Sequence, residues 1–190
     1  KMKRRNYIVI TSCIFFIVAV FFLNQKFPPE PIHEVPYFSY PDQNNKFFTT
    51  NNLLGKVTIA DFFFTSCPVT CPRMKAYMKQ LHEFYDMNTG VQFLSISVDP
   101  KNDTKSRIND FINDRGLSYS NWFFLQSDEQ SIVDLLEKGF LLSGEGLPGR
   151  HSTKFILIDS NAQILGYYEY SDKEDFNDLI ADATYLLNRL

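Results

Sequence analysis

Residues 57–72 read VTIADFFFTSCPVTCP, and this stretch decides the fold. Its first half, residues 57–64, is β-branched and aromatic, which is typical of a buried strand. Its second half carries Cys67 and Cys71 and ends at Pro72, which suits the first helical position because an amide hydrogen there would have no partner. The stretch therefore predicts a strand that leads directly into a helix, with two cysteines at the junction.

The rest of the body alternates between strand-like and helix-like patterns. Residues 91–98, 122–125, 154–159 and 163–168 resemble strands, and residues 72–87, 104–115, 129–139 and 173–190 resemble helices. Strands joined through helices are expected to pair in parallel, whereas 154–159 and 163–168 are joined by a tight turn and should be antiparallel. This order predicts a thioredoxin-like α/β fold, with a mixed central sheet flanked by helices and an N-terminal hairpin before Val57.

One face of the helix predicted over residues 72–87 is apolar. Met74 and Met78 recur at helical spacing, which marks core packing rather than thioether ligands. His82 shares the opposite, polar face with charged side chains, so we expect it to face water.

The N-terminal 26 residues predict a membrane anchor. Residues 1–6 are polar and basic, and residues 7–23, YIVITSCIFFIVAVFFL, are almost wholly apolar. As a helix this run would span about 25 Å, at the short end for crossing a bilayer. A cleaved signal peptide and a lipoprotein modified at Cys13 are the alternatives, although the residues after the run suit a signal-peptidase site badly. The basic residues before the run predict a cytoplasmic N-terminus and a body on the periplasmic side of a bacterial inner membrane.

Residues 24–36 are expected to form a linker to a folded domain over residues 37–190. Four of the nine prolines lie within residues 27–36. Such a stretch favours an extended, semi-rigid polyproline II conformation. We therefore expect His33, which lies in it, to be solvated.

The charge of the body argues against one class of partner. Residues 27–190 hold 14 Lys and Arg against 22 Asp and Glu, a net charge of −8. Binding of nucleic acid needs a basic surface that neutralises phosphates. We therefore expect no nucleic-acid partner.

Cys67 and Cys71 are the two cysteines of the body, and three residues separate them. Two inert buried thiols and a plain structural disulfide are the bland alternatives. At the start of a helix, however, free amides and the helix dipole are expected to lower the pKa of a thiol such as Cys71. Thioredoxin-type redox pairs have two intervening residues, so this wider loop leaves the sulfurs freer to hold a metal, although it can still close as a disulfide.

His151 is the best candidate for a third ligand. It lies just before the strand predicted over residues 154–159. In thioredoxin-like folds the loop before the corresponding strand faces the cysteine loop and usually carries a cis-proline, and here His151 and Ser152 stand in its place. A histidine in a surface loop with no ligand is the alternative.

Two thiolates and one imidazole form a soft ligand set. Sulfur selects Cu(I), and one added nitrogen also admits Cu(II). A structural zinc ion would want a fourth protein ligand, and none is obvious in the sequence. The set therefore favours an open copper site, which suits transfer of the ion by ligand exchange.

Three motifs in order, DFFFTSCPVTCP (61–72), SVDPKNDT (97–104) and HSTKFILID (151–159), together with one N-terminal anchor, resemble the Sco/SenC proteins over roughly residues 35–190. The resemblance implies a copper-binding metallochaperone that delivers copper to, or reduces the cysteines of, the binuclear copper centre of cytochrome c oxidase. By position it implies that Cys67, Cys71 and His151 are the copper ligands. It also places Asp99 near the site as an outer carboxylate, whereas the bland alternative is that Asp99 and Asp103 form a turn and cap the next helix.

Two functions therefore remain open. The first is a membrane-tethered copper chaperone, a transfer protein rather than an enzyme, whose partner is the copper-centre subunit of the oxidase or another copper protein. The second is an extracytoplasmic thiol-disulfide oxidoreductase with Cys67 as the nucleophile and Cys71 as the resolving thiol. Only the first needs His151 as a ligand.

Overall fold

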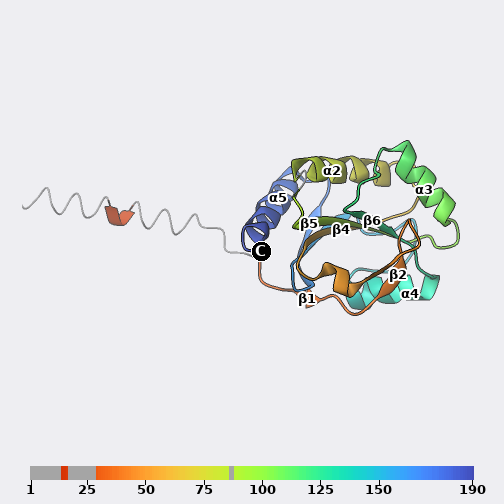
Figure 1. The fold of residues 1–190 in the computed structure, drawn as a ribbon, viewed down its shortest axis with the longest axis horizontal. Helices are drawn as coiled ribbons and strands as arrows, with labels where there is room; N and C mark the ends of the chain where they lie inside the picture. The colour runs from red at the N-terminus through yellow and green to blue at the C-terminus, as the bar shows by residue number, and fades with distance from the viewer. Residues whose placement is uncertain (1–13, 17–28, 86–87) are drawn as a thin grey trace, which may run out of the picture.

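The computed structural model describes residues 14–16, 29–85 and 88–190, and its centre is a six-stranded sheet (Figure 1). The strands lie side by side in the order β1-β8-β7-β4-β5-β6. In chain order they are β1 (His33–Glu34), β4 (Val57–Phe63), β5 (Val91–Ser97), β6 (Trp122–Leu125), β7 (Lys154–Ile158) and β8 (Gln163–Glu169).

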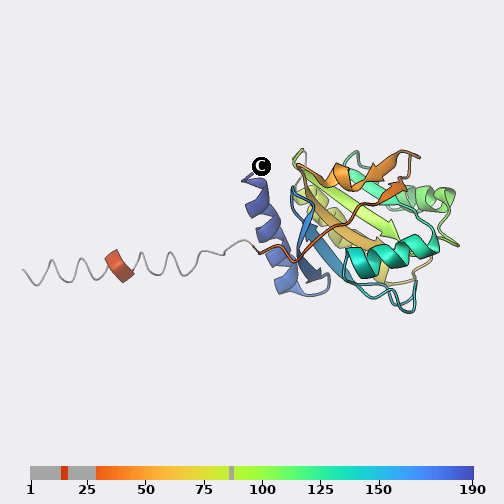
Figure 2. The same ribbon diagram turned by 90° about the horizontal axis from the view of Figure 1, so that it is seen from below.

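Helices cover both faces of this sheet. One face packs against α2 (Thr70–Phe84), α3 (Lys105–Asp114) and α5 (Lys173–Leu187). The other face packs against α4 (Glu129–Asp134), its π-helical continuation η2 (Leu135–Gly139), the hairpin of β2 (Ser39–Pro41) with β3 (Phe47–Thr49), and the 3-10 turn η1 (Thr50–Leu53). In Figure 2, seen from below, α4 lies in front of the sheet. The predicted thioredoxin-like α/β architecture and the predicted N-terminal hairpin are both confirmed.

The alternation of side chains along β4 explains these two layers. Ile59 and Phe63 point into the core beneath α2, whereas Ala60 and Phe62 point into the core above α4. Successive side chains of a strand point to opposite faces, so a strand covered on both sides is apolar throughout. Thr58 and Asp61 are the polar exceptions in this strand, and both are fully buried, but only Asp61 carries a charge.

The direction of β7 differs from the prediction. β4, β5 and β6 are parallel to one another, but β7 runs antiparallel to β4, with Ala60 opposite Ile156. After η2, residues 140–153 return the chain to the carboxyl end of β4, and β7 begins there and runs back alongside β4. Extending the register therefore brings the residues before β7 level with those after β4, which positions the site.

The N-terminal predictions have mixed outcomes. The folded body begins within residues 24–36, the segment expected to be a linker, because His33 and Glu34 pair with β8 and Val35 is buried. His33 is half-buried and its Nε2 donates to the carbonyl oxygen of Lys138 at 2.9 Å, so its side chain is only partly solvated. The anchor expected over residues 7–23 and the basic segment 1–6 lie outside the described residues, apart from 14–16. In the described part of the chain, no helix combines the length and apolar character needed to cross a membrane.

The predicted apolar face of α2 is confirmed, but part of the face predicted to be exposed is buried. Met74 and Met78 are fully buried, as predicted. His82 is only 9% exposed, which contradicts the expectation that it faces water. Its ring stacks on Tyr119 with centroids 3.8 Å apart, and its Nε2 donates to the Asn121 side chain at 2.8 Å. The loop before β6 covers this end of the helix, a long-range contact that helical periodicity does not reveal.

Candidate metal centre

The cysteines lie at the junction between β4 and α2. The helix begins at Thr70, two residues before the predicted start, so Cys71 sits in its first turn. Cys71 has no exposed surface, whereas Cys67, in the preceding loop, keeps 8%. His151 also keeps 8% and comes from the loop before β7, a loop that contains a cis peptide at Leu147–Pro148.

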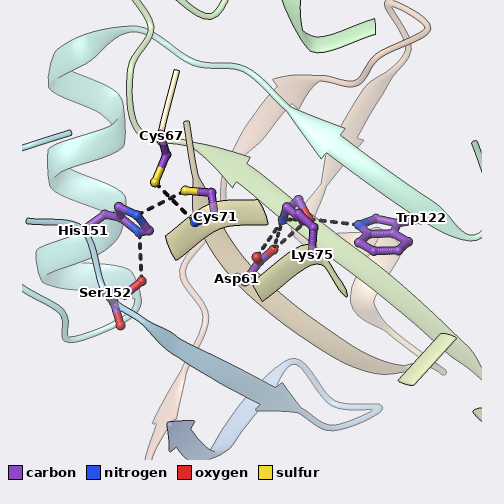
Figure 3. A network of polar contacts seen from close by, with 8 residues as sticks. Asp61, Cys67, Cys71, Lys75, Trp122, His151 and Ser152 are labelled. Carbon is purple, nitrogen blue, oxygen red and sulfur yellow. Dashed lines mark hydrogen bonds and ion pairs between the residues drawn. The ribbon is translucent and has the colours of Figure 1, made fainter. Parts of the chain in front are cut away.

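The fold brings Cys67, Cys71 and His151 together, although Cys71 and His151 are 80 residues apart in the chain (Figure 3). Their three potential ligand atoms all lie within 4.8 Å of one another. Cys71 Sγ is 3.4 Å from His151 Nε2, and the Cys71 N–H donates to Cys67 Sγ at 3.2 Å. Both thiols are free. The spatial arrangement expected from the sequence is therefore present.

The hydrogen bonds of His151 settle which nitrogen is available. Nδ1 lies 2.9 Å from the carbonyl oxygen of Ser152, and a carbonyl oxygen only accepts, so Nδ1 carries the hydrogen. Nε2 of the neutral ring then presents a lone pair toward Cys71. Burial lowers the pKa of His151, which favours this neutral, ligand-competent form. The ring of Phe64 meets the imidazole edge-on at 5.4 Å.

The electrostatics of Cys71 differ from the prediction. We expected the helix start to lower the pKa of Cys71, but burial raises the pKa of this thiol to about 12. The sulfur lies among apolar side chains of the core, where a charged thiolate is poorly solvated. The amide at the start of the helix is directed at the sulfur of Cys67 instead.

The centre opens to solvent on one side through a hollow of about 260 Å³. Cys67 and His151 line this hollow, whereas Cys71 lies behind them. An ion could therefore reach two of the three side chains directly from solvent. The other lining residues come from the same two loops: Phe64, Pro68, Val69, Thr70, Gly149 and Thr153.

The sequence analysis did not predict a buried ion pair that lies next to the site. Lys75 Nζ lies 2.6 Å from both carboxylate oxygens of Asp61 and 2.7 Å from Ser95 Oγ, which also accepts from Trp122 Nε1 (Figure 3). Lys75 comes one helical turn after Cys71, and its ammonium lies 4.6 Å above the Phe63 ring. The signal that could have revealed it is Asp61 itself, a carboxylate within an apolar strand that needs a buried partner.

The second motif contributes a different carboxylate from the one expected. Asp99 accepts two hydrogen bonds from Asn102 within its own turn, and among the described contacts none joins it to the cysteines or His151. Asp103, which is fully buried, instead holds the cysteine loop. It accepts from the Thr65 amide at 3.0 Å and from the Ser97 hydroxyl at 2.6 Å.

The donor set is compatible with a soft metal ion. Two sulfurs and an imidazole nitrogen suit copper, and ligands sharing one ion at about 2.0–2.3 Å lie at most about 4.5 Å apart. The observed separations therefore need only small movements. Since Cys67 and His151 face the open hollow, ligands from another molecule could replace these two side chains on a bound ion.

Comparisons with known proteins agree with this fold and with the family resemblance expected from the sequence. The family profile of SCO1/SenC matches residues 28–187. A SCO1 protein homolog of Bacillus subtilis is 32% identical over 157 residues, which cover 80% of this chain and 81% of that protein.

Solved structures give the same result. A SCO1/SenC family lipoprotein from Bacillus anthracis superposes with a TM-score of 0.74 at 32% identity, over 83% of this chain and 97% of the other. BsSco, described as a member of the Sco family of cytochrome c oxidase assembly proteins with a disulfide switch, superposes with a TM-score of 0.75 at 29% identity, over 84% and 97%. The chain therefore belongs to the SCO1/SenC family.

Proposed function

We propose that this member of the SCO1/SenC family binds copper through Cys67, Cys71 and His151 and helps to assemble the binuclear copper centre of cytochrome c oxidase. The observation that carries the proposal is the His151 Nε2 lone pair, which faces Cys71 Sγ at 3.4 Å, with Cys67 Sγ completing the set. The relatives support the assignment to oxidase assembly, since BsSco is named for that role.

The three side chains would play different parts in loading and release. Cys71 is the buried anchor, and it must give up its proton when copper binds. Cys67 and His151 line the open hollow, so ligands of a recipient protein can approach and replace them one at a time. The Nδ1–H bond to Ser152 keeps the imidazole oriented while this exchange takes place.

A copper titration of His151→Ala tests the proposal. We expect the Cu(II) affinity of this variant to fall by at least about 100-fold, because removing a ligand should lower the affinity at least as much as removing a group that hydrogen-bonds to a ligand. The sulfur-to-copper charge-transfer absorption should shift as well. His33→Ala is the matched control, since its ring bonds to Lys138 outside the site. Unchanged affinity and absorption in His151→Ala would mean that the three-ligand site is wrong.

A thiol-disulfide oxidoreductase is the second candidate. It is favoured by the contrast between a more exposed Cys67, whose sulfur accepts an amide hydrogen bond, and a buried Cys71. Cys67 would attack a disulfide and Cys71 would resolve the mixed disulfide. Turnover of a disulfide substrate that survives His151→Ala would favour this function over copper transfer.

The N-terminal segment is proposed to tether the domain to the membrane. The apolar run over residues 7–23 and the basic residues before it support an anchor with the folded domain on the periplasmic side. The full chain should remain in the membrane fraction after alkaline extraction, and a chain starting at residue 29 should not. Release of the full chain by alkali would contradict the anchor.

A further inference from the structure

The loop that carries Cys67 is tied to the rest of the fold by one buried carboxylate. Asp103 Oδ1 accepts hydrogen bonds from the Thr65 amide at 3.0 Å and from the Thr65 hydroxyl at 2.5 Å. Thr65 lies two residues before Cys67. Among the hydrogen bonds of the described residues, these join residues 64–69 to a distant side chain, whereas the others link the loop to itself or to the start of α2. Asp103 therefore fixes the path of this loop.

The carboxylate itself is held by three other parts of the fold. Asp103 has no exposed surface, and its Oδ2 accepts from the hydroxyl of Ser97, the last residue of β5, at 2.6 Å. Its amide donates to the carbonyl oxygen of Asp99 at 2.8 Å. The next residue, Thr104, is the N-cap of α3. Thr65 is thus bonded to a side chain that has little freedom to move.

Hydrogen bonds alone compensate the buried carboxylate. In the part of the chain that the structure describes, the ion pairs involve Lys75, Lys101 and Lys138, and none of them reaches Asp103. A buried carboxylate is tolerated only when donors occupy its oxygens, and the donors in turn depend on it as their acceptor. Loss of the carboxylate would therefore release Thr65 and the loop that follows it.

We propose that Asp103 is a positioning residue for copper binding, which holds the sulfur of Cys67 in place for the ion through Thr65. The other two ligands have supports of their own, since Cys71 lies in the first turn of α2 and His151 Nδ1 is bonded to a backbone carbonyl oxygen. A ligand on a loose loop would lose conformational freedom when the ion binds, which weakens binding. The inference rests on the proposed function, because it concerns the same copper site.

The Cu(I) affinity of Asp103→Ala, measured by chelator competition without oxygen, tests this role. We expect a loss of about tenfold, the lower end of the range for removing a group that supports a metal ligand. Asp103→Asn keeps an acceptor for Thr65 and should recover most of the loss. Asp42→Ala is the matched control, because Asp42 is also a buried carboxylate that accepts from two backbone amides, but in the turn between β2 and β3. Its affinity should stay within about twofold of the wild type.

A double-mutant cycle shows whether the effect passes through Thr65. Thr65→Val removes the hydroxyl that donates to Asp103, so we expect the Cu(I) affinity to fall by about threefold. In the Asp103→Ala background the same change should have no further effect, because the acceptor is already absent. Thr65→Val and Asp103→Asn carry the test if Asp103→Ala does not fold.

Amide hydrogen exchange of the copper-free protein gives a readout that does not depend on copper. In Asp103→Ala the amides of residues 65–67 should exchange about tenfold faster, as expected for the loss of one hydrogen bond. The amides of β4 should exchange as in the wild type, whereas a general loss of stability would accelerate both segments.

Four results would each overturn the positioning role. These are an unchanged copper affinity in Asp103→Ala, an equal loss in Asp42→Ala, a Thr65→Val effect that persists without Asp103, and equal acceleration of exchange in the loop and in β4. Failure of the wild type to bind copper would instead overturn the proposed function, and the exchange measurement would still decide whether Asp103 holds the loop.

Discussion

A buried histidine lies at each end of α2, but only one of the two rings faces other potential metal ligands. At the first turn, His151 Nε2 lies 3.4 Å from Cys71 Sγ. At the last turn, His82 stacks on Tyr119 and donates from Nε2 to Asn121. The hollow beside His82 is the larger, at about 440 Å³ against about 260 Å³.

This difference teaches that the neighbours of a histidine, rather than cavity size or burial, mark the candidate metal site. His82 donates to an amide oxygen and lies among aromatic rings, which is a structural role. His151 has its donor nitrogen occupied by a backbone carbonyl and its lone pair turned toward sulfur. In the portion of the chain that the structure describes, Cys67, Cys71 and His151 form the one group of at least three potential ligands.

The largest effect is expected at the site end of α2, from Lys75→Met. Removing one partner of a buried ion pair leaves Asp61 charged and unpaired, so we expect the free energy of unfolding to fall by about 3–5 kcal/mol. Urea denaturation measures the change. Lys79→Met, one turn further along the helix, is the control and should lose far less. Equal losses in the two variants would show that the pair contributes little.

The next effect is the pH dependence of copper binding at the first turn of α2. Burial raises the pKa of Cys71 to about 12, so this thiol holds its proton in the metal-free protein near neutral pH. Copper must displace that proton, so the affinity should rise with pH, by up to about tenfold per pH unit for each proton released. Competition with a Cu(I) chelator at pH 6, 7 and 8 without oxygen measures the slope. An affinity independent of pH would contradict the assignment of Cys71 as a ligand.

The smallest effect is expected at the far end, from His82→Gln. The loss of ring stacking and of a well-placed donor to Asn121 should lower the free energy of unfolding by about 1–2 kcal/mol. Copper affinity should stay within about twofold of the wild type, since His82 supplies nothing to the site. A large loss of copper affinity in this variant would break the contrast between the two histidines.

The sequence allowed the site to be predicted where local pattern and topology agree. The strand-to-helix junction fixes the cysteines, and the loop before β7 carries His151, so the arrangement follows from the fold class. The direction of β7 was predicted wrongly, because hydrophobic pattern does not encode strand direction.

Buried polar side chains were the other failure. Lys75 and His82 both fall on the polar side of the α2 pattern, yet the sheet and the loop before β6 cover them. Their partners, Asp61 and Asn121, come from distant parts of the chain. The sequence analysis assigned Asp103 to a turn and a helix cap and missed its contact with Thr65 for the same reason, since the two residues are 38 positions apart.

X-ray absorption at the copper edge of the copper-loaded chain tests the central claim most directly. We predict a first shell of two sulfur atoms and one imidazole nitrogen, with the imidazole contribution lost in His151→Ala and kept in His82→Gln. A shell without imidazole in the wild type, or one that is the same in His151→Ala, would contradict the three-ligand copper site.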